Sequence, residues 1–246
     1  MKKIIFGMFL TLTSIVSAIS FTVYPTRFEI DSKAVGIYEA EVVNNTQEPL
    51  RVTMYVEEDP NFGKDYNINE NIVVVPKNIS LKPGASQTVR FRFKPDKNKM
   101  NGEYKSNIIF KEIPLDIKSV SKANDNTEGM TSNVRFITEM AIPVYALGEN
   151  LQKDGELSNV KVITAGNVVN IEADAISKGN TKLEFLYSIK EVNGSYKSEG
   201  VLGYSTRNGK NKISTSIPLD GKLKGKKLEL RIYDSQKEYY KNKINF

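Results

Sequence analysis

The amino-acid sequence predicts an all-β protein made of two β-sandwich domains, and three observations lead to this prediction. Short segments rich in Val, Ile, Phe, Tyr and Thr recur about every ten residues between turns rich in Asn, Gly, Pro, Asp and Lys, as strands do. Several segments alternate between apolar and polar residues, which is typical of a half-buried antiparallel strand. No segment keeps a helical period of apolar residues along its length.

The first domain is expected over residues 19–147 and contains seven predicted strands. The alternation is clearest in Leu50–Val56 and in Val89–Phe93, where three apolar residues alternate with Arg90 and Arg92. Seven short strands in a domain of roughly this size are typical of an immunoglobulin-like sandwich. The predicted strands are Phe21–Ile30, Gly36–Asn44, Leu50–Glu57, Ile72–Val75, Thr88–Lys94, Glu103–Ile113 and Val134–Leu147.

The second domain is expected over residues 148–246 and is predicted to be another β-sandwich. A polar stretch that contains glycine, Leu147–Asn150, follows the last long apolar strand and predicts the boundary. Within the first domain, the polar segment Ile117–Ser132 is predicted to be a long loop that is either functional or a mobile surface segment. The predicted strands of the second domain are Leu157–Thr164, Val168–Ala175, Leu183–Val192, Tyr196–Tyr204, Lys212–Ile217 and Lys226–Asp234.

Residues 1–18 are predicted to be a secretory signal peptide. Lys2 and Lys3 precede an apolar run, Ile4–Val16, which is shorter than a membrane-spanning helix. The small residues that follow predict cleavage after Ala18, with Ser20 as the alternative site. We therefore expect an exported protein without membrane insertion.

Composition excludes several kinds of function. The 246 residues include no Cys and no His, so thiol nucleophiles, disulfides, Ser-His-Asp hydrolases and the usual tetrahedral zinc sites are excluded. The 35 Lys and Arg residues are interspersed with 29 Asp and Glu residues, as on a solvated surface, which argues against binding nucleic acid. We expect no catalytic residue, no cofactor and no metal.

Four motifs follow one another in a fixed order along residues 21–147. Tyr24–Phe28 contains a Thr-Arg pair, and Val42–Thr46 ends an apolar strand in an Asn-containing turn. Pro76 then precedes Leu81-Lys82-Pro83-Gly84 and Gln87-Thr88-Val89-Arg90, and Asn107–Pro114 ends in Glu-Ile-Pro. This ordered set resembles the periplasmic chaperones of bacterial pilus and fimbria assembly, of which the chain looks like a divergent member. Residues 150–246 share only the general pattern of that family's second domain.

The resemblance implies two immunoglobulin-like domains in an L-shaped arrangement and a chaperone that acts in the periplasm. Such a chaperone lends its G strand to a pilus or fimbrial subunit that lacks its last strand, and so covers an edge that would otherwise aggregate. The implied partners are these subunits and an outer-membrane usher that assembles them. Whether the free protein caps its own strand as a homodimer stays open.

The resemblance also implies roles for four residues. Arg27 corresponds to the family's cleft arginine, which anchors the C-terminal carboxylate of the subunit. A guanidinium suits this role because it is always charged and can bind both carboxylate oxygens. Met130, Val134 and Phe136 correspond to the donated apolar side chains. The residues alone leave open that Val134 and Phe136 fill the core of their own domain instead.

One position departs from the family's pattern. The family pairs its arginine with a lysine on the donated strand, and Ala141 takes that place here. Lys105, Lys111 and Arg135 are candidates for the missing charge, and a different anchoring mode is the alternative.

Two other function classes fit parts of the sequence. A secreted adhesin or fibre subunit would also be a β-sandwich, but it would need a donor-like extension before its first strand, and Phe21 closely follows the expected cleavage site. A glycosidase would need a pair of carboxylates flanking its substrate. The acidic trio Glu57-Glu58-Asp59 precedes Pro60 and is better explained as a solvated turn.

Overall fold

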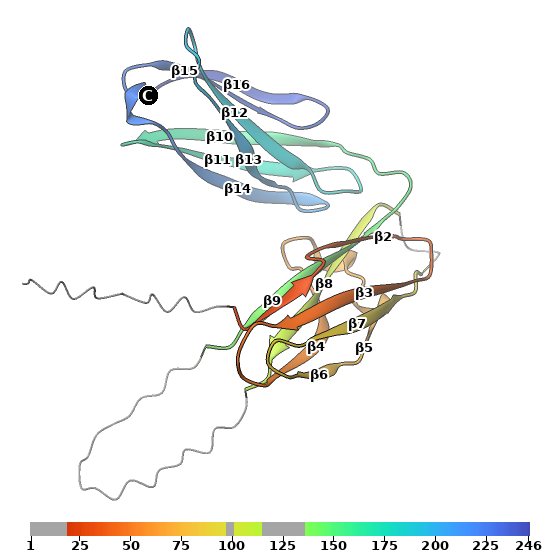
Figure 1. The fold of residues 1–246 in the computed structure, drawn as a ribbon. Coiled ribbons are helices and arrows are strands. Elements are labelled where there is room, and N and C mark those ends of the chain that lie inside the picture. The colour runs from red at the N-terminus through yellow and green to blue at the C-terminus, as the bar shows by residue number, and fades with distance from the viewer. Residues whose placement is uncertain (1–18, 97–100, 115–135) are drawn as a thin grey trace, which may run out of the picture.

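The structure is a computed structural model that describes residues 19–96, 101–114 and 136–246. The predicted signal peptide and the polar segment 117–132 lie outside the described residues, as do Met130, Val134 and Arg135. The described strands form two β-sandwich domains that meet at an angle, so the predicted fold class is confirmed (Figure 1).

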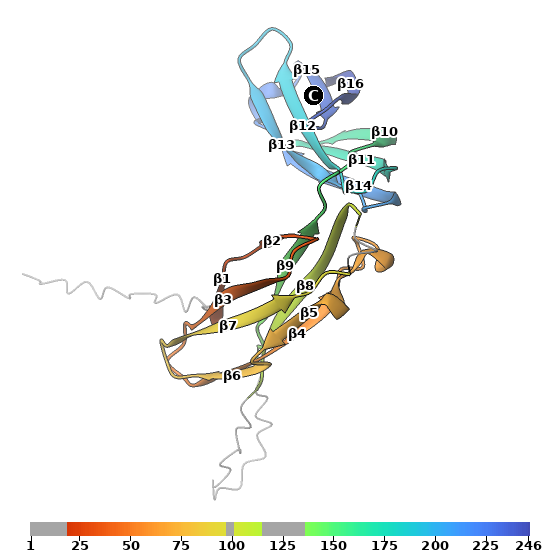
Figure 2. The same cartoon turned by 90° about the vertical axis from the view of Figure 1, so that its right-hand side faces the viewer.

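Two sheets stack face to face in the first domain (Figure 2). One has the strand order β1-β3-β7-β5, and the other has the order β2-β9-β8-β4-β6. Two short 3₁₀ helices, η1 (Lys64–Tyr66) and η2 (Asn69–Asn71), precede β5. The strands are β1 (Phe21–Tyr24), β2 (Phe28–Asp31), β3 (Gly36–Asn44), β4 (Leu50–Glu58), β5 (Ile72–Val75), β6 (Asn78–Leu81), β7 (Ser86–Phe93), β8 (Glu103–Glu112) and β9 (Glu139–Leu147).

The alternating residues of these strands form the core between the two sheets. Phe91 of β7 is 2% exposed, and its ring centroid lies 4.9 Å from that of Phe28 and 5.2 Å from that of Tyr38. These three rings join β2, in one sheet, to β3 and β7 in the other. The core therefore fixes the position of β2, which matters below because Arg27 immediately precedes that strand.

The prediction of one strand over residues 21–30 is wrong, because the chain changes sheets there. β1 pairs antiparallel with β3, whereas β2 pairs parallel with β9 in the opposite sheet. Pro25 lies in the crossing, where its missing N–H costs no ladder hydrogen bond. Phe21 and Val23 are buried before the crossing, and Phe28 and Ile30 after it. The buried positions therefore shift from odd to even numbers.

Two further strand predictions need correction in the first domain. The sequence prediction lacks β6, a strand of four residues that follows β5 after only two residues and buries Ile79 and Leu81. β9 begins at Glu139 rather than Val134, and the described residues 136–138 before it form no strand.

β9 has a different neighbour on each side. Along its whole length it pairs antiparallel with β8, from Glu139 opposite Lys111 to Leu147 opposite Glu103. On the other side, β2 covers only Val144–Leu147. Among the described residues, no strand pairs with that side of Glu139–Pro143, so this stretch is an open sheet edge.

The second domain is a smaller sandwich of a three-stranded and a four-stranded sheet. Their orders are β10-β11-β14 and β13-β12-β15-β16, and the core includes Ile171, Phe185 and Leu230, all fully buried. The strand β16 was not predicted, because it is an edge strand of mostly exposed polar residues. The elements are β10 (Gly155–Ala165), β11 (Val168–Ser177), β12 (Glu184–Glu191), β13 (Lys197–Tyr204), β14 (Gly209–Pro218), η3 (Gly221–Leu223), β15 (Lys227–Tyr233) and β16 (Glu238–Asn245).

Candidate functional site

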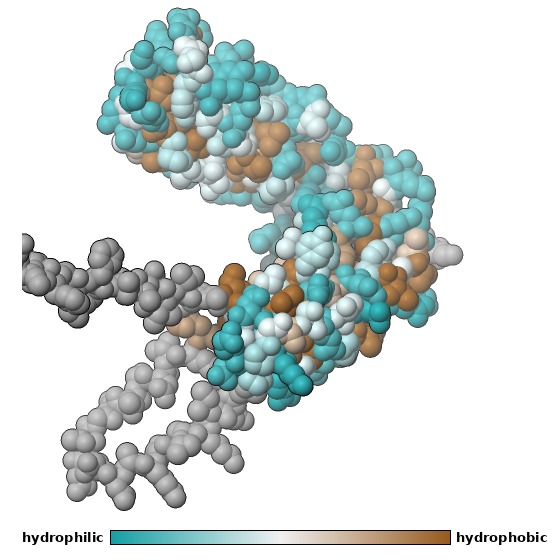
Figure 3. Space-filling model, in the orientation of Figure 1, coloured by the Kyte–Doolittle hydropathy of each residue, from teal (hydrophilic) through white to brown (hydrophobic). Residues whose placement is uncertain are grey.

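A cleft of about 530 Å³ lies where the two domains meet. The first domain contributes Arg27, Lys105 and Tyr145 to its lining, and the second domain contributes Lys182 and Tyr204. In the space-filling view, a hollow separates the two lobes on one side of the molecule (Figure 3). Lys212 of β14 also lines it, so four cations from four separate segments of the chain surround one cleft.

Tyr145 lies at the centre of three of these cations. It lies on β9 next to the junction and is 5% exposed. The guanidinium carbon of Arg27 lies 4.3 Å from the centroid of its ring, Lys182 Nζ 4.6 Å and Lys105 Nζ 5.3 Å. Cations at this distance are attracted by the aromatic face, which offsets part of their mutual repulsion.

Arg27 lies between β1 and β2, at the point where the chain changes sheets. Its only ion pair among the described residues is with Glu29, and the two side chains are 50% and 52% exposed. An ion pair this exposed contributes about 0–1 kcal/mol. The guanidinium is therefore held over Tyr145 but can readily exchange Glu29 for another carboxylate.

Lys105 is one of the three residues that the sequence offered for the missing lysine, and it does lie in the cleft. It is on β8 directly opposite Tyr145. Its Nζ forms an ion pair with Asp59, and the two side chains are only 14% and 16% exposed. Its charge is thus largely neutralised within the first domain.

Of the other two candidates, Lys111 lies away from the cleft. Lys111 is six residues from Lys105 along β8, about 20 Å at the rise of a strand. It pairs with Glu139 at 2.6 Å, and the hydrogen bond to Glu139 raises the pKa of Lys111. Ala141 is exposed on β9 opposite Ile109, and Arg135 lies outside the described residues.

Lys182 is a cleft cation that the sequence did not reveal. It lies in the segment between β11 and β12 of the second domain. Its Nζ donates a hydrogen bond to the Tyr145 hydroxyl at 3.1 Å and lies 4.7 Å from the centroid of the Tyr204 ring. No motif marks this lysine, because it reaches the cleft only through the packing of one domain on the other.

Tyr204 closes the cleft from the second domain. Its hydroxyl donates to Glu184 at 2.9 Å, and this hydrogen bond, with burial, raises the pKa of Tyr204. The phenol therefore stays neutral at physiological pH and contributes no negative charge to the cleft.

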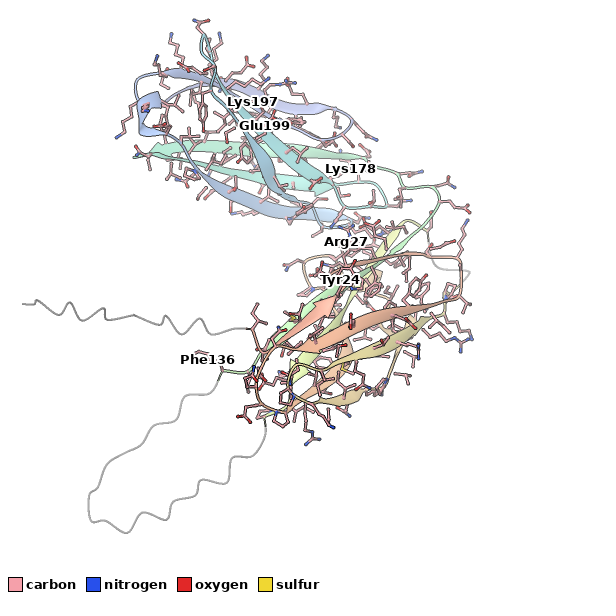
Figure 4. The ribbon with its side chains drawn as sticks, viewed as in Figure 1. Tyr24, Arg27, Phe136, Lys178, Lys197 and Glu199 are labelled. Carbon is pink, nitrogen blue, oxygen red and sulfur yellow. The ribbon has the colours of Figure 1, made fainter. Side chains whose placement is uncertain are left out.

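Phe136 lies at the other end of the first domain, just before β9 begins (Figure 4). Its side chain is 84% exposed and that of Ile137 is 49% exposed, so neither fills the core of the domain. β9 runs from this end to the junction, where Arg27 lies (Figure 4). The exposed apolar residues and the cleft cations are thus at opposite ends of the open edge of β9.

The described residues offer no sign of metal chemistry or of a helical membrane anchor. They contain no group of three or more acidic side chains placed to hold a metal ion. Within the same ranges, no helix has the length and apolar character needed to cross a membrane.

Comparison with known proteins gives one family. Residues 20–145, more than half of the chain, match the model described as pili and flagellar-assembly chaperone, PapD N-terminal domain. No curated protein sequence matches the chain.

Solved structures with a similar architecture include three chaperones. The YadV chaperone has a TM-score of 0.51 and 10% identity, with 92% of this chain and 100% of that chain covered. The E. coli chaperone DraB has a TM-score of 0.46, 15% identity and coverage of 93% and 99%. The Acinetobacter baumannii complex of the chaperone CsuC with the tip adhesion subunit CsuE has a TM-score of 0.44 and 16% identity, with 92% of this chain and 98% of that chain covered. At these identities the likeness concerns the fold alone.

Proposed function

The chain belongs to the family of pili and flagellar-assembly chaperones, and we propose that it holds a fibre subunit along the open edge of β9 with the subunit's C-terminal carboxylate at Arg27. Its function is chaperoning in pilus assembly, in a family whose members act in the periplasm. The family match favours this function over that of a secreted adhesin or fibre subunit. The particular residues that bind the subunit are the content of the proposal.

The single observation that carries the proposal is the partial cover of β9 by β2. β2 runs parallel to β9 and ends the open edge at Val144. We place a guest strand beside Glu139–Pro143, parallel to β9. It would lie in line with β2 and end where β2 begins, so its C-terminus would arrive next to Arg27.

The chemistry of Arg27 suits the end of such a strand. A terminal carboxylate can accept two parallel N–H bonds from a guanidinium, whereas the exposed pair with Glu29 is easily exchanged. Hydrogen bonds to charged groups contribute about 1.5–3 kcal/mol. The contact would also fix the register of the guest strand, because it defines where that strand ends.

The apolar residues before β9 provide the second part of the interaction. We assign Met130, Val134 and Phe136 to the groove of the subunit, where they would replace the side chains of its missing strand. Phe136 supports this assignment, because a phenylalanine that is 84% exposed has no role in the packing of its own domain. Backbone pairing along β9 and side-chain burial before it would cover the subunit's exposed edge.

The proposal extends to the cell. We assign residues 1–18 to a signal peptide that is removed on export, and we expect an outer-membrane usher to receive the complex. The free protein exposes the edge of β9, so a homodimer that pairs two such edges is a further expectation. The proposed role requires no cofactor, metal or catalytic residue.

The test is recovery of the subunit from a periplasmic extract with the tagged protein, followed by mass spectrometry. The wild type should recover a small exported β-protein at one-to-one stoichiometry. Phe136→Glu should recover none, since a carboxylate cannot enter an apolar groove without a large desolvation cost. The matched control is Ile37→Glu, which changes a residue on β3 that is 69% exposed and should bind normally.

A second pair of variants tests the cleft. Arg27→Ala should weaken subunit binding about 10- to 100-fold while the protein remains folded. Arg90→Ala removes a somewhat more exposed arginine that pairs with Glu39, and should have no effect on binding. Subunit recovery that is unchanged by both Phe136→Glu and Arg27→Ala would refute the proposal.

A further inference from the structure

We propose that Lys182, from the second domain, supplies the second positive charge of the carboxylate site in place of the lysine that Ala141 replaces. This inference rests on the proposed function, because it names a further residue that binds the same subunit carboxylate. The inference goes beyond the proposed function because it assigns part of the carboxylate site to the second domain.

The first argument is that, of the three cations around the Tyr145 ring, Arg27 and Lys105 have ion pairs among the described residues and Lys182 has none. Within the described ranges, its ammonium group contacts the hydroxyl of Tyr145 and the rings of Tyr145 and Tyr204, and it forms no ion pair. A partly buried ammonium group that lacks a carboxylate is costly, so a ligand that brings one is favoured.

The second argument is the contrast with Lys105, which lies beside the same ring. The Lys105 ammonium already has Asp59 as a partner, and both side chains are largely shielded from water. Recruiting Lys105 would break an ion pair in a poorly solvated place, whereas recruiting Lys182 replaces only a hydrogen bond to a neutral phenol.

The third argument is that the fold holds Lys182 in place. The carboxylate of Glu103, on β8 of the first domain, accepts two hydrogen bonds from the segment that contains Lys182. One comes from the hydroxyl of Thr181 and the other from the backbone N–H of Lys182, at 3.0 Å. The backbone N–H of Glu103 in turn donates to the carbonyl of Asn180 at 2.8 Å. Glu103 is therefore the positioning residue that fixes this segment of the second domain against the first.

The fourth argument is the geometry around Tyr145. The guanidinium carbon of Arg27 and Nζ of Lys182 lie 4.3 Å and 4.6 Å from the centroid of the same ring. We place one carboxylate beside this ring, with an oxygen toward each cation through charge-assisted N–H···O bonds of about 2.7–2.9 Å. Ala141 is four residues from Tyr145 along β9, about 13 Å away, so its methyl group takes no part in this pair of cations.

A two-domain site has a consequence for the complex. The carboxylate would contact Arg27 on one domain and Lys182 on the other, so binding of the subunit would also hold the two domains together. The second domain would then take part in recognition of the subunit.

The experiment compares binding of a synthetic peptide that carries the C-terminal strand of the recovered subunit, as a free acid and as an amide. Lys182→Met removes the charged end and keeps an unbranched side chain of nearly the same length, and Lys182→Arg keeps the charge. Lys178→Met is the matched control, because Lys178 is in the same segment but pairs with Glu156 (Figure 4). Thermal melts of every variant check that it is folded.

We expect the free acid to bind about ten-fold or more weakly to Lys182→Met than to the wild type, and almost normally to Lys182→Arg and Lys178→Met. The preference of the wild type for acid over amide should shrink in Lys182→Met by the same factor, because the variant lacks the group that senses the charge.

Two results would overturn the inference. One is wild-type affinity of Lys182→Met for the acid. The other is weaker binding with an unchanged preference for acid over amide, which would give Lys182 a structural role. Arg27→Ala and Phe136→Glu separate this failure from that of the proposed function. If those variants lose binding and Lys182→Met does not, only the assignment of Lys182 is wrong.

Discussion

The side chain of Arg207 joins the two domains through the main chain of Glu103. Nε of Arg207 donates to the Glu103 carbonyl oxygen at 2.7 Å, and Nη2 donates to the Asn101 carbonyl oxygen at 2.6 Å. The guanidinium carbon also lies 3.7 Å from the centroid of the Tyr66 ring, and Arg207 is 5% exposed. Since Glu103 also positions Lys182, the junction and the cleft share one residue.

The first prediction concerns this junction. Arg207→Met should lower the free energy of unfolding by about 1.5–3 kcal/mol, because the carbonyl groups of Glu103 and Asn101 lose a charged donor. Small-angle X-ray scattering should also show a wider distribution of domain orientations. Urea unfolding gives the first quantity. Arg231→Met, which removes a partly exposed arginine paired with Glu238, should change stability by no more than about 0.5 kcal/mol.

The second prediction concerns the counter-ion of Lys105. Asp59→Asn should destabilise the protein by between about 1 and 3 kcal/mol, since the pair with Lys105 is more shielded than an exposed ion pair and less than a fully buried one. The same change leaves an extra positive charge in the cleft, so the subunit should bind several-fold faster. Stopped-flow association should show that this gain shrinks at high salt. A slower association would contradict the electrostatic account of the cleft.

The third prediction concerns Asn44, which ends β3 in one of the motifs noted in the sequence. The side chain is 1% exposed; its amide nitrogen donates to the carbonyl groups of Glu48 at 2.8 Å and Lys82 at 3.0 Å, and its oxygen accepts from the backbone N–H of Thr46 at 2.9 Å. Asn44→Asp keeps the shape but turns a donor toward those carbonyl groups into an acceptor. We expect the free energy of unfolding, measured with urea, to fall by about 1–3 kcal/mol or more. Asn45→Asp, at an exposed neighbour, is the control, and equal effects would contradict the argument.

The sequence predicts most of the strands because one face of each is buried. In β4 and β7, the alternation of apolar and polar residues matches the alternation of buried and exposed side chains, and the predicted bounds agree with the structure to within two residues. The crossing at Pro25 was missed, although the shift of apolar positions between Val23 and Phe28 could have shown it. β16 could not be predicted in this way, because few of its side chains are buried.

The cleft was only partly predictable for a different reason. Arg27 could be found because it belongs to a motif, and Lys105 because it lies on a recognisable strand. Lys182 belongs to neither, and its position depends on hydrogen bonds from Thr181 and its own backbone to Glu103 in the other domain. Contacts between residues this far apart in sequence leave no periodic pattern in either segment.

The fourth prediction concerns pH and the second domain. Burial acts to raise the pKa of Asp234, but hydrogen bonds from the backbone N–H groups of Lys237 and Gln236 and from the Tyr239 hydroxyl outweigh it and hold the pKa below its usual value. A depressed folded-state pKa contributes stability that is complete above the unfolded-state pKa, about 3.9, and is lost as the pH falls through the folded-state value. Asp234→Asn should therefore be less stable than the wild type near neutral pH.

The measurement is the urea midpoint of wild type and Asp234→Asn over a series of pH values. The difference should stay constant down to about pH 4 and shrink below it. Asp220→Asn is the control, because that carboxylate accepts a single backbone hydrogen bond in an exposed turn. A difference between wild type and Asp234→Asn that does not change with pH would exclude the ionised carboxylate as its source.

Because β2 covers part of β9, the proposed binding edge is closed at one end and open at the other. β2 blocks the edge from Val144 onward, whereas nothing among the described residues limits a strand that extends beyond Glu139. The register of a guest strand would therefore be set by the position of its last residue. One residue added at that end would push the guest back by one position and turn every inward side chain outward, because side chains in a strand alternate with a period of two. The length and sequence of bound subunits could thus vary on the N-terminal side of the guest strand. The number of residues between the final carboxylate and the nearest buried side chain would stay the same.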